Sequence, residues 1–261
     1  MSSIEIYQVD SFTDKLFHGN PAAVCILEHW LNDELMQAIA IENNLSETAF
    51  VVADGDHFKI RWFTPSNEVS LCGHATLAAA SVLFELGKGV DNILRFLSMH
   101  DTIEVVKKEG LYTLDFPRMP FHPSSSQQQL IDLLNEPVLE AYDSELDYML
   151  VLENEEAVIN VKPDLDKLSQ LEKRGLIITA PGLSSDIYSR CFYPKLKIAE
   201  DPVTGSAHCV LTPYWCERLG KNSLYAIQGL YRKGDLFCEL KDQRVAISGA
   251  CRGYMKGHIQ I

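Results

Sequence analysis

One pattern occurs twice in the chain, and this internal repeat is the feature that most restricts the fold. The two copies run from Phe63 to Gly87 and from Phe192 to Gly220. Each begins with Phe-x-Pro, continues through a loop to a Gly-x-Ala tripeptide at Gly73 or Gly205, and reaches a glutamate after nine more residues. Each copy predicts a strand, a loop, a glycine that lets the backbone approach something closely, and a helix that is closed by a C-terminal glycine.

Two copies are too few for a solenoid, which needs about three or more units to bury its faces. The repeat therefore predicts a pair of pseudo-symmetric lobes. A chance match of one degenerate pattern is the alternative.

The rest of the chain predicts mainly sheet, with few helices. Short alternating or apolar segments predict strands, namely 4–9, 24–27, 58–63, 102–106, 111–116, 177–179 and 245–248. Glu109-Gly110 predicts a hairpin turn. A helix is expected after Asn32, whose side chain can cap it, with Leu35, Ile39 and Ala40 on one face and an end near 43–44. Further helices are expected over 128–134 and 164–173.

A segment rich in Pro, Ser and Gln, residues 117–129, predicts a domain boundary because it continues neither a strand ladder nor an apolar pattern. The expected domains are residues 1–118 and 119–261, and the last strand can return to the first lobe. A long surface loop inside a single domain is the alternative.

Composition excludes some partners. The 261 residues carry a formal net charge of −13, which argues against a surface that binds nucleic-acid phosphates. No run approaches the roughly 18 apolar residues of a membrane span, and the N-terminus lacks the pattern of a signal peptide. The odd number of cysteines, seven, fits reduced thiols. We therefore expect a soluble, cytoplasmic protein that binds neither nucleic acid nor membrane.

If the two lobes face each other, two helix N-termini point into one cleft and favour binding of a carboxylate. The residues that open these helices are then candidates for proton transfer or substrate binding: Cys72 and His74 in the first copy, Asp201 and Ser206 in the second. A buried cysteine that only packs, and an Asp-Pro that only starts a turn, are the alternatives.

Glu47 is a third candidate because it lies among apolar residues in Leu-Ser-Glu-Thr-Ala-Phe-Val-Val. If its side chain faces inward, desolvation should raise its pKa toward neutral pH, as a general acid or base requires. A solvent-facing residue at a strand edge is the alternative. Asn20 similarly fits either a turn or a substrate contact.

Several motifs together resemble the phenazine-biosynthesis (PhzF-like) isomerase family, which has the diaminopimelate epimerase-like fold. The match runs in order from near residue 7 to near residue 249 and includes 9–12, 19–24, 44–50, 61–65, 72–76, 200–208 and 228–229. The resemblance implies an α+β protein with two pseudo-symmetric lobes, each a mostly antiparallel sheet wrapped around a central helix. It also implies a site in the cleft between the lobes.

By this resemblance, the protein is an isomerase that moves a proton between carbons of a small carboxylate-bearing substrate. The reaction is general acid/base catalysis that needs no metal or organic cofactor, and the resemblance suggests a homodimer. The implied catalytic residues are Glu47, His74 and Asp201. The implied substrate-binding residues are Asn20, Ser46, Cys72, Gly73, Gly205 and Ser206. Racemases of this fold use two cysteines, whereas this chain has Asp201 at the second position, so a two-thiol stereoinversion is not expected.

Three alternatives stay open. The first is a non-catalytic protein of the same fold that binds a small acid or another protein. The second is a hydrolase with Cys72 as nucleophile and His208 as base. The third is a metal site of Cys72, His74, Asp201 and His208, although the spacing of the first pair is too close for usual zinc ligands.

Overall fold

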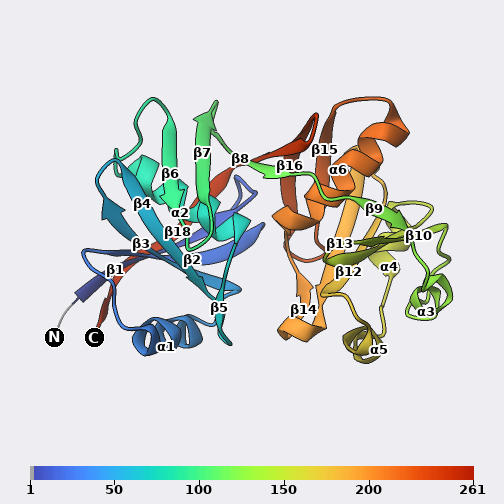
Figure 1. Cartoon of the computed structure of the whole chain (residues 1–261), viewed down its shortest axis with the longest axis horizontal. Helices are drawn as coiled ribbons and strands as arrows, with labels where there is room; N and C mark the ends of the chain where they lie inside the picture. The colour runs from blue at the N-terminus through green and yellow to red at the C-terminus, as the bar shows by residue number, and fades with distance from the viewer. Residues whose placement is uncertain (1–2) are drawn as a thin grey trace. The chain divides into compact units, whose positions relative to one another are not determined.

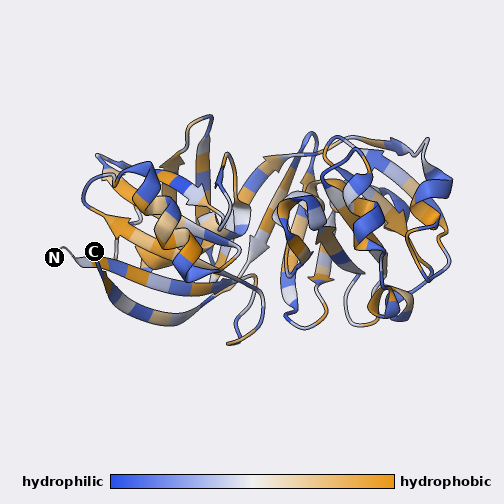
Figure 2. Cartoon of the chain, turned by 90° about the horizontal axis from the view of Figure 1, so that it is seen from below, coloured by the Kyte–Doolittle hydropathy of each residue, from blue (hydrophilic) through white to orange (hydrophobic). Residues whose placement is uncertain are grey.

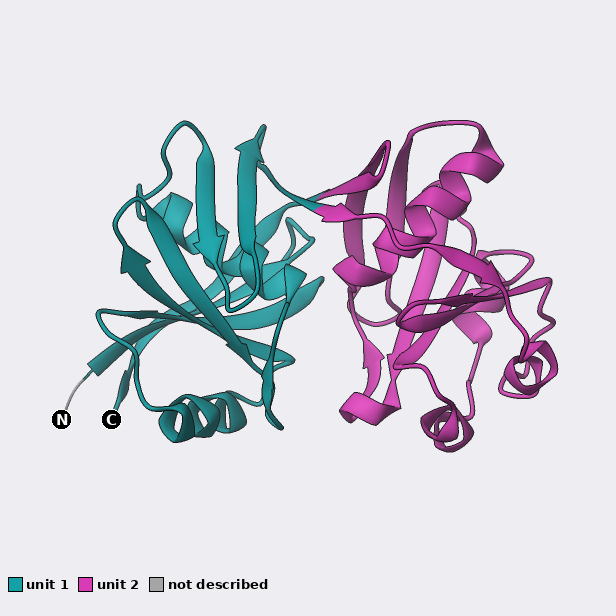
Figure 3. Ribbon diagram, in the orientation of Figure 1, with its two compact units in different colours: residues 1–115, 248–261 teal, residues 116–247 magenta. Residues whose placement is uncertain are grey.

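The computed structural model describes residues 3–261 and divides into two compact units (Figure 3). Unit 1 comprises the described residues up to Asp115 together with Ser248–Ile261, and unit 2 comprises Phe116–Ile247. The chain passes from unit 1 to unit 2 within one strand, β8, and returns within another, β17. Across the described residues, no helix has the length and apolar character that a membrane span requires.

Unit 1 is built from strands and two helices (Figure 1). In chain order its elements are β1 (Ser3–Ser11), β2 (Asn20–Leu27), α1 (Asp33–Asn43), β3 (Glu47–Asp54), β4 (His57–Phe63), β5 (Glu68–Val69), α2 (Gly73–Glu85), β6 (Ile93–Leu97), β7 (Thr102–Lys108), most of β8 (Leu111–Pro117) and β18 (Cys251–Gln260).

Unit 2 has the same character. Its elements are β9 (Phe121–Pro123), α3 (Gln127–Ile131), β10 (Glu140–Ser144), β11 (Asp147–Val151), α4 (Glu155–Asn160), α5 (Leu165–Gln170), β12 (Gly175–Pro181), β13 (Ile187–Tyr193), the 3₁₀ turn η1 (Pro194–Leu196), β14 (Ile198–Asp201), α6 (Gly205–Leu219), β15 (Ser223–Gln228), β16 (Gly234–Lys241) and most of β17 (Arg244–Gly249).

The strands of the two units pair in the same way. In unit 1, β2 is antiparallel to β1 and parallel to β3, and β4 is antiparallel to β3 and β5 and parallel to β6. In unit 2, β11 is antiparallel to β10 and parallel to β12, and β13 is antiparallel to β12 and β14 and parallel to β15. The sequence repeat is therefore a structural repeat, which rules out a chance match.

The central helix of each unit, α2 or α6, follows the strand that ends in Phe-x-Pro, β4 or β13, and precedes the strand that pairs parallel with it, β6 or β15. Both helices are buried along most of their length, as expected for helices that are apolar on nearly every side. Each is followed by a glycine in the left-handed region: Gly87, two residues after α2, has a φ of 69°, and Gly220, directly after α6, has a φ of 65°. Strands such as β7 and β16 alternate buried and exposed residues, whereas β11, β12 and β13 are buried along nearly their whole length. Figure 2 shows where hydrophilic and hydrophobic residues lie along the chain.

The same ion pair ties two strands together in each unit. The guanidinium of Arg61 on β4 donates to both carboxylate oxygens of Glu68 on β5, at 2.7 and 2.6 Å. The guanidinium of Arg190 on β13 does the same to Glu200 on β14, at 2.9 and 2.8 Å. Because Glu200 directly precedes Asp201, this bidentate pair fixes the strand that carries a candidate residue.

Two local predictions are confirmed. The Asn32 side chain accepts from the backbone N–H of Leu35 and caps α1, which ends at Asn43. Strands β7 and β8 are joined by Glu109 and Gly110, both with positive φ, as a tight hairpin requires.

Other predictions are wrong in detail. The segment 117–129 does continue a ladder, because β9 pairs with β10 through Phe121–Pro123. Pro123 is tolerated because it lies at the end of a short strand. The strand expected at 24–27 begins four residues earlier, at Asn20. The helices expected at 128–134 and 164–173 are shorter, namely α3 and α5, and α4 was not predicted.

Pro213 lies inside α6, where it removes one helical N–H donor. The carbonyl that this donor would serve belongs to Cys209, four residues earlier. That carbonyl accepts instead from the backbone N–H of Met119 at 2.9 Å. The proline therefore frees a helix carbonyl for the segment that leads into β9.

Candidate functional site

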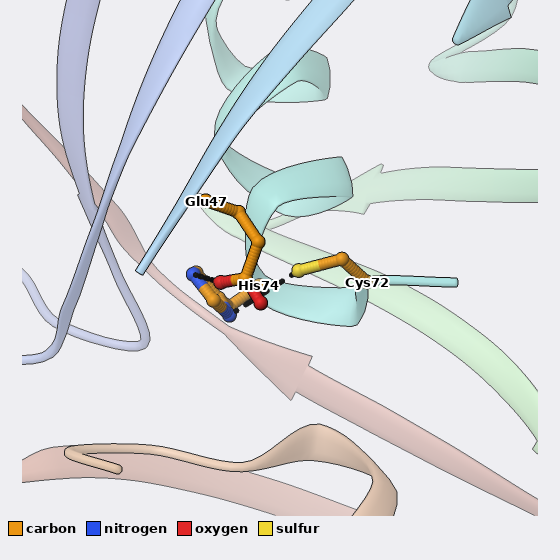
Figure 4. A group of neighbouring side chains, drawn as sticks. All are labelled: Glu47, Cys72 and His74. Atoms are coloured by element: carbon orange, nitrogen blue, oxygen red, sulfur yellow. Dashed lines mark hydrogen bonds and ion pairs between the residues drawn. The ribbon is translucent and has the colours of Figure 1, made fainter. Parts of the chain in front are cut away.

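Three candidate side chains of unit 1 meet at the start of α2 (Figure 4). Glu47 is the first residue of β3, Cys72 is the N-cap of α2, and His74 lies in the first turn of that helix. Glu47 Oε2 lies 3.2 Å from His74 Nε2, and Cys72 Sγ lies 3.5 Å from His74 Nδ1. The imidazole therefore has the carboxylate at one nitrogen and the thiol at the other.

Asn20, Ser46 and Ser11 extend the polar cluster around His74. Because β2 and β3 run parallel, their first residues lie at the same edge of the sheet, beside α2. Asn20 Nδ2 lies 3.4 Å from His74 Nδ1, and Ser46 Oγ donates to Asn20 Oδ1 at 3.3 Å. The Ser11 hydroxyl donates to the His74 carbonyl at 2.7 Å. Six of the predicted site residues thus lie together in unit 1: Asn20, Ser46, Glu47, Cys72, Gly73 and His74.

His74 is neutral in this environment. The residue is buried, and burial lowers the pKa of its imidazole to about 3. A neutral imidazole has one N–H and one acceptor nitrogen. The tautomer with its N–H at Nε2 would place a donor 3.2 Å from the carboxylate of Glu47 and leave Nδ1 to accept from Asn20. Glu47 is only partly buried, with 14% of its side chain exposed, so it lies at the surface of this cluster.

Unit 2 places Asp201 in a different setting. Asp201 ends β14 and is buried, and its Oδ2 accepts from the hydroxyl of Thr204 at 2.5 Å. The buried side chain of Gln228 donates from Nε2 to the Asp201 carbonyl and to Thr204 Oγ1, and its Oε1 accepts from the Thr204 N–H. Asp201 is therefore held by a hydrogen-bonded loop.

Ser206, in the first turn of α6, contacts a cation. Its Oγ accepts from Arg174 Nη2 at 3.1 Å. Arg174 also donates to both carboxylate oxygens of the buried Asp147, at 3.0 and 2.6 Å. A hydroxyl that accepts from a guanidinium keeps its own proton available for another acceptor.

Neither central helix has a side-chain N-cap. Helices α1, α4 and α5 are capped by Asn32, Asn154 and Asp164. The N-cap residues of α2 and α6 make no such side-chain bond. The first N–H groups of α2 and α6, those of Gly73 and Gly205 among them, therefore stay available to an anion. A Cβ built on Gly205 would meet no atom within 4 Å, so this turn borders open space.

His208 is a buried structural residue. Its Nδ1 donates to the Thr204 carbonyl at 2.9 Å, and burial lowers its pKa to about 4. The histidine that contacts Cys72 is His74. Since Nδ1 of His208 is engaged one turn back along its own helix, it fits neither a hydrolase base nor a metal ligand at that nitrogen.

Glu47, Cys72 and His74 are also the group of described residues whose donor atoms lie close enough to suggest a metal site. The thiol and the carboxylate contact different nitrogens of the ring. A metal ion binds one imidazole nitrogen, so an ion at Nδ1 would lie beside the thiol, and an ion at Nε2 would lie beside the carboxylate. The geometry favours a hydrogen-bonded cluster over a metal centre.

A cavity of about 700 Å³ in unit 2 lies at the other end of α6. Its lining includes Arg118, Glu217 and Lys221, and none of the candidate residues. Size alone does not identify the site here, because the cluster of polar groups lies at the N-terminal ends of the helices.

Sequence reasoning missed Arg174, Asp147, Thr204 and Gln228 as members of the candidate site. Thr204 and Gln228 stand inside motifs that carry the family resemblance. Arg174 and Asp147 have no local signal in the sequence. Asp147 begins β11 and Arg174 directly precedes β12, and only the parallel pairing of these two strands brings the two residues together.

Comparisons with known proteins agree with the fold. The sequence profile of the family described as phenazine biosynthesis-like protein matches residues 9–257. An uncharacterized isomerase of Pseudomonas aeruginosa is 47% identical over 258 residues, which cover 99% of each chain.

Solved structures extend the comparison. A phenazine biosynthesis protein of the PhzF family from Enterococcus faecalis is 46% identical, with a TM-score of 0.95 and full coverage of both chains. A hydroxyproline epimerase from Agrobacterium vitis has a TM-score of 0.65 at 8% identity, covering 98% of this chain and 92% of its own, which shows a shared fold only. The expected α+β fold of two epimerase-like lobes is confirmed. With the profile match and these relatives, the chain belongs to the phenazine biosynthesis-like (PhzF) protein family.

Proposed function

We propose that this protein is an isomerase that moves a proton between two carbons of a small carboxylate-bearing substrate, with Glu47 as the acid/base. The observation that carries the proposal is the contact of 3.2 Å between the partly buried Glu47 carboxylate and the buried, neutral His74. Relatives that are named isomerases support the reaction class.

The chemistry balances without a redox step. The Glu47 carboxylate takes a proton from a carbon made acidic by conjugation, which leaves a delocalised carbanion on the substrate. The protonated Glu47 then returns the proton to a second carbon of the same conjugated system. His74, with its N–H toward Glu47, orients the carboxylate and stabilises its charge.

The groups of unit 2 have the complementary role in this proposal. Uncapped N–H groups of α6 and the Ser206 hydroxyl are donors that suit a carboxylate or a developing enolate. Asp201, held by Thr204 and Gln228, assists proton transfer or orients a substrate amine or hydroxyl. Cys72 contributes a thiol beside His74 that limits the space at the start of α2.

Exchange in deuterated water tests the proposal. Small unsaturated and hydroxy amino acids and conjugated carboxylic acids are incubated with the protein, and NMR follows deuterium at each carbon. We expect label with at least one acid for the wild type, and a loss of about 1,000-fold for Glu47→Gln, which keeps the shape but not the basicity. Equal exchange by both proteins would contradict the role of Glu47. If no acid exchanged, the alternative of a binding protein would replace the isomerase.

Two further expectations belong to this proposal. The free state of all seven cysteines, six of them buried, supports a reducing compartment such as the cytoplasm. The homodimer suggested by the family resemblance is tested by light scattering of the eluted protein, for which we expect twice the chain mass of 29.3 kDa.

A further inference from the structure

Arg174 is held from several directions. Its guanidinium is bound in a bidentate manner by Asp147, whose side chain is 2% exposed, and lies 4.8 Å from the centre of the Tyr193 ring. Its backbone N–H donates to the Leu146 carbonyl at 2.8 Å. A guanidinium that is fixed in this way has one orientation, so the remaining N–H of Nη2 points at a fixed place.

That place is the hydroxyl of Ser206. Arg174 Nη2 donates to Ser206 Oγ at 3.1 Å. Guanidinium groups only donate hydrogen bonds, whereas a serine hydroxyl offers one donor and two acceptor lone pairs. With one lone pair taken by Arg174, the Ser206 proton must point away from it. The nearby positive charge also makes this O–H a better donor.

The structural repeat shows that this contact has a counterpart in unit 1. Phe63 pairs with Thr48, and Phe192 pairs with Leu176, so the strands β3 and β12 align at these positions. The alignment places Arg174 where unit 1 has Ser46, and Gly205-Ser206 where it has Gly73-His74. In unit 1 a carboxylate from this strand start contacts the helix start, and in unit 2 a cation does so.

We propose that Arg174 is a positioning residue that holds Ser206 as a one-way hydrogen-bond donor to a carboxylate ligand. The proposal rests on the proposed function for the class of ligand. Arg174 acts through Ser206, and Asp147 and Tyr193 keep the guanidinium in place.

A double-mutant cycle with benzoate as probe tests this role. Benzoate is a planar conjugated carboxylate with no proton for the enzyme to move, so its affinity, measured by calorimetry, does not depend on turnover. We expect Arg174→Met to weaken benzoate binding about tenfold in the wild-type background and less than about twofold when Ser206→Ala is present. Arg174→Lys should restore only part of the affinity, because lysine lacks the bidentate fork. Arg118→Met, at an exposed arginine of unit 2, should leave the affinity unchanged.

Three outcomes would overturn the proposal. Equal weakening in both backgrounds would show that Arg174 acts without Ser206. No effect of Arg174→Met, or no saturable benzoate binding by the wild type, would show that the pair does not serve a carboxylate. A failure of the exchange test with benzoate coupling intact would instead affect only the proposed isomerase.

Folding is controlled with a second variant. Arg174→Met alone leaves the buried Asp147 carboxylate without its cation, which can destabilise the unit. The pair Asp147→Asn/Arg174→Met removes both charges. This double variant should have a melting temperature close to that of the wild type. It should still bind benzoate about tenfold more weakly than the wild type, and adding Ser206→Ala should weaken its binding by less than about twofold more. Wild-type affinity in this folded variant would contradict the proposal.

Discussion

The two units share one strand order and differ in the side chains at the starts of one strand and of the central helix. The second strand of the first parallel pair begins with Glu47 in unit 1 and with Gly175 in unit 2. The helix that faces it begins Gly73-His74 in one unit and Gly205-Ser206 in the other. The repeated scaffold presents two uncapped helix N-termini, and the side chains beside them separate the chemistry: an acid with a neutral imidazole in unit 1, a cation with a hydroxyl in unit 2.

Packing explains why unit 2 has no acid at this position. A Cβ on Gly175 would lie 2.2 Å from Cδ1 of Tyr193 and 2.5 Å from the carbonyl oxygen of Phe192. The residue of unit 1 that corresponds to Tyr193 is Thr64, which is smaller. The tyrosine ring that supports Arg174 therefore occupies the space that a side chain at 175 would need. The same ring that stacks on the guanidinium of Arg174 thus leaves no space for a carboxylate side chain at position 175.

A large effect, second only to that of Glu47→Gln, is expected at the imidazole of unit 1. His74→Asn removes the ring that contacts Glu47, and we expect the exchange rate to fall about 100-fold, equivalent to about 2.7 kcal/mol. His100→Asn, at an exposed histidine of the same unit, should have no effect. NMR exchange rates measure both. A wild-type rate for the His74 variant would remove the difference in chemistry between the units.

A glycine pair tests the packing difference. Gly175→Ala should lower the free energy of unfolding by about 2 kcal/mol, because its Cβ meets both a ring and a backbone carbonyl. Gly205→Ala is the matched control, since its Cβ meets no atom within 4 Å and the residue begins a helix. Urea unfolding of both variants measures the difference. Equal stabilities would contradict the account of why unit 2 lacks the acid.

The buried histidines predict how stability depends on pH. His208 has a pKa of about 4 in the fold, below its ordinary value of 6.5, so the unfolded chain binds a proton that the native state refuses. Above pH 6.5 the residue has no effect, and between pH 6.5 and 4 it costs up to about 1.4 kcal/mol of stability per pH unit. His74 adds the same trend down to about pH 3 in unit 1.

The variant His208→Asn isolates the contribution of unit 2 to the pH dependence of the free energy of unfolding. Asparagine keeps a donor for the Thr204 carbonyl but cannot titrate. Between pH 6.5 and 5.5, the wild type should lose about 1 kcal/mol more than the variant in urea unfolding. If the two proteins lost stability in parallel, titration of His208 would have no part in the acid sensitivity.

The smallest expected effect concerns the difference between the central helices. Pro213 of α6 corresponds to Ser81 of α2. Pro213→Ser gives the helix back its N–H, which competes with Met119 for the Cys209 carbonyl. Because one hydrogen bond replaces another, we expect a change in the free energy of unfolding below about 1 kcal/mol. A loss well above that value would show that the proline is needed for the segment before β9.

Signals confined to a few neighbouring residues were the ones that sequence reasoning interpreted well. Asn32 caps the helix that follows it, and Glu109-Gly110 forms a two-residue turn whose positive φ values need little outside support. The repeat was visible because both central helices keep the same spacing from glycine to glutamate. Helix α4 had a usable signal in Asn154, which caps it, but its six residues are too few for a clear period.

Long-range pairing decided what could not be predicted. Pro123 discouraged a strand that exists because β10 supplies a partner. Glu47 and His74 are 27 positions apart, and the family resemblance, not local pattern, connected them before the structure showed their contact. Arg174 had no such support. Only the alignment of the two units through Phe63 and Phe192 gives it a place beside Ser206.

The most direct test compares exchange at saturating substrate for Glu47→Gln and Ser206→Ala, using an acid that the wild type deuterates. If unit 1 transfers the proton and unit 2 supplies the hydrogen-bond donors that bind the substrate carboxylate, Glu47→Gln should lower the exchange rate at saturation about 1,000-fold. The second should mainly raise the substrate concentration needed for half-saturation, by about tenfold. An equal loss of saturated rate in both variants would contradict this division of roles.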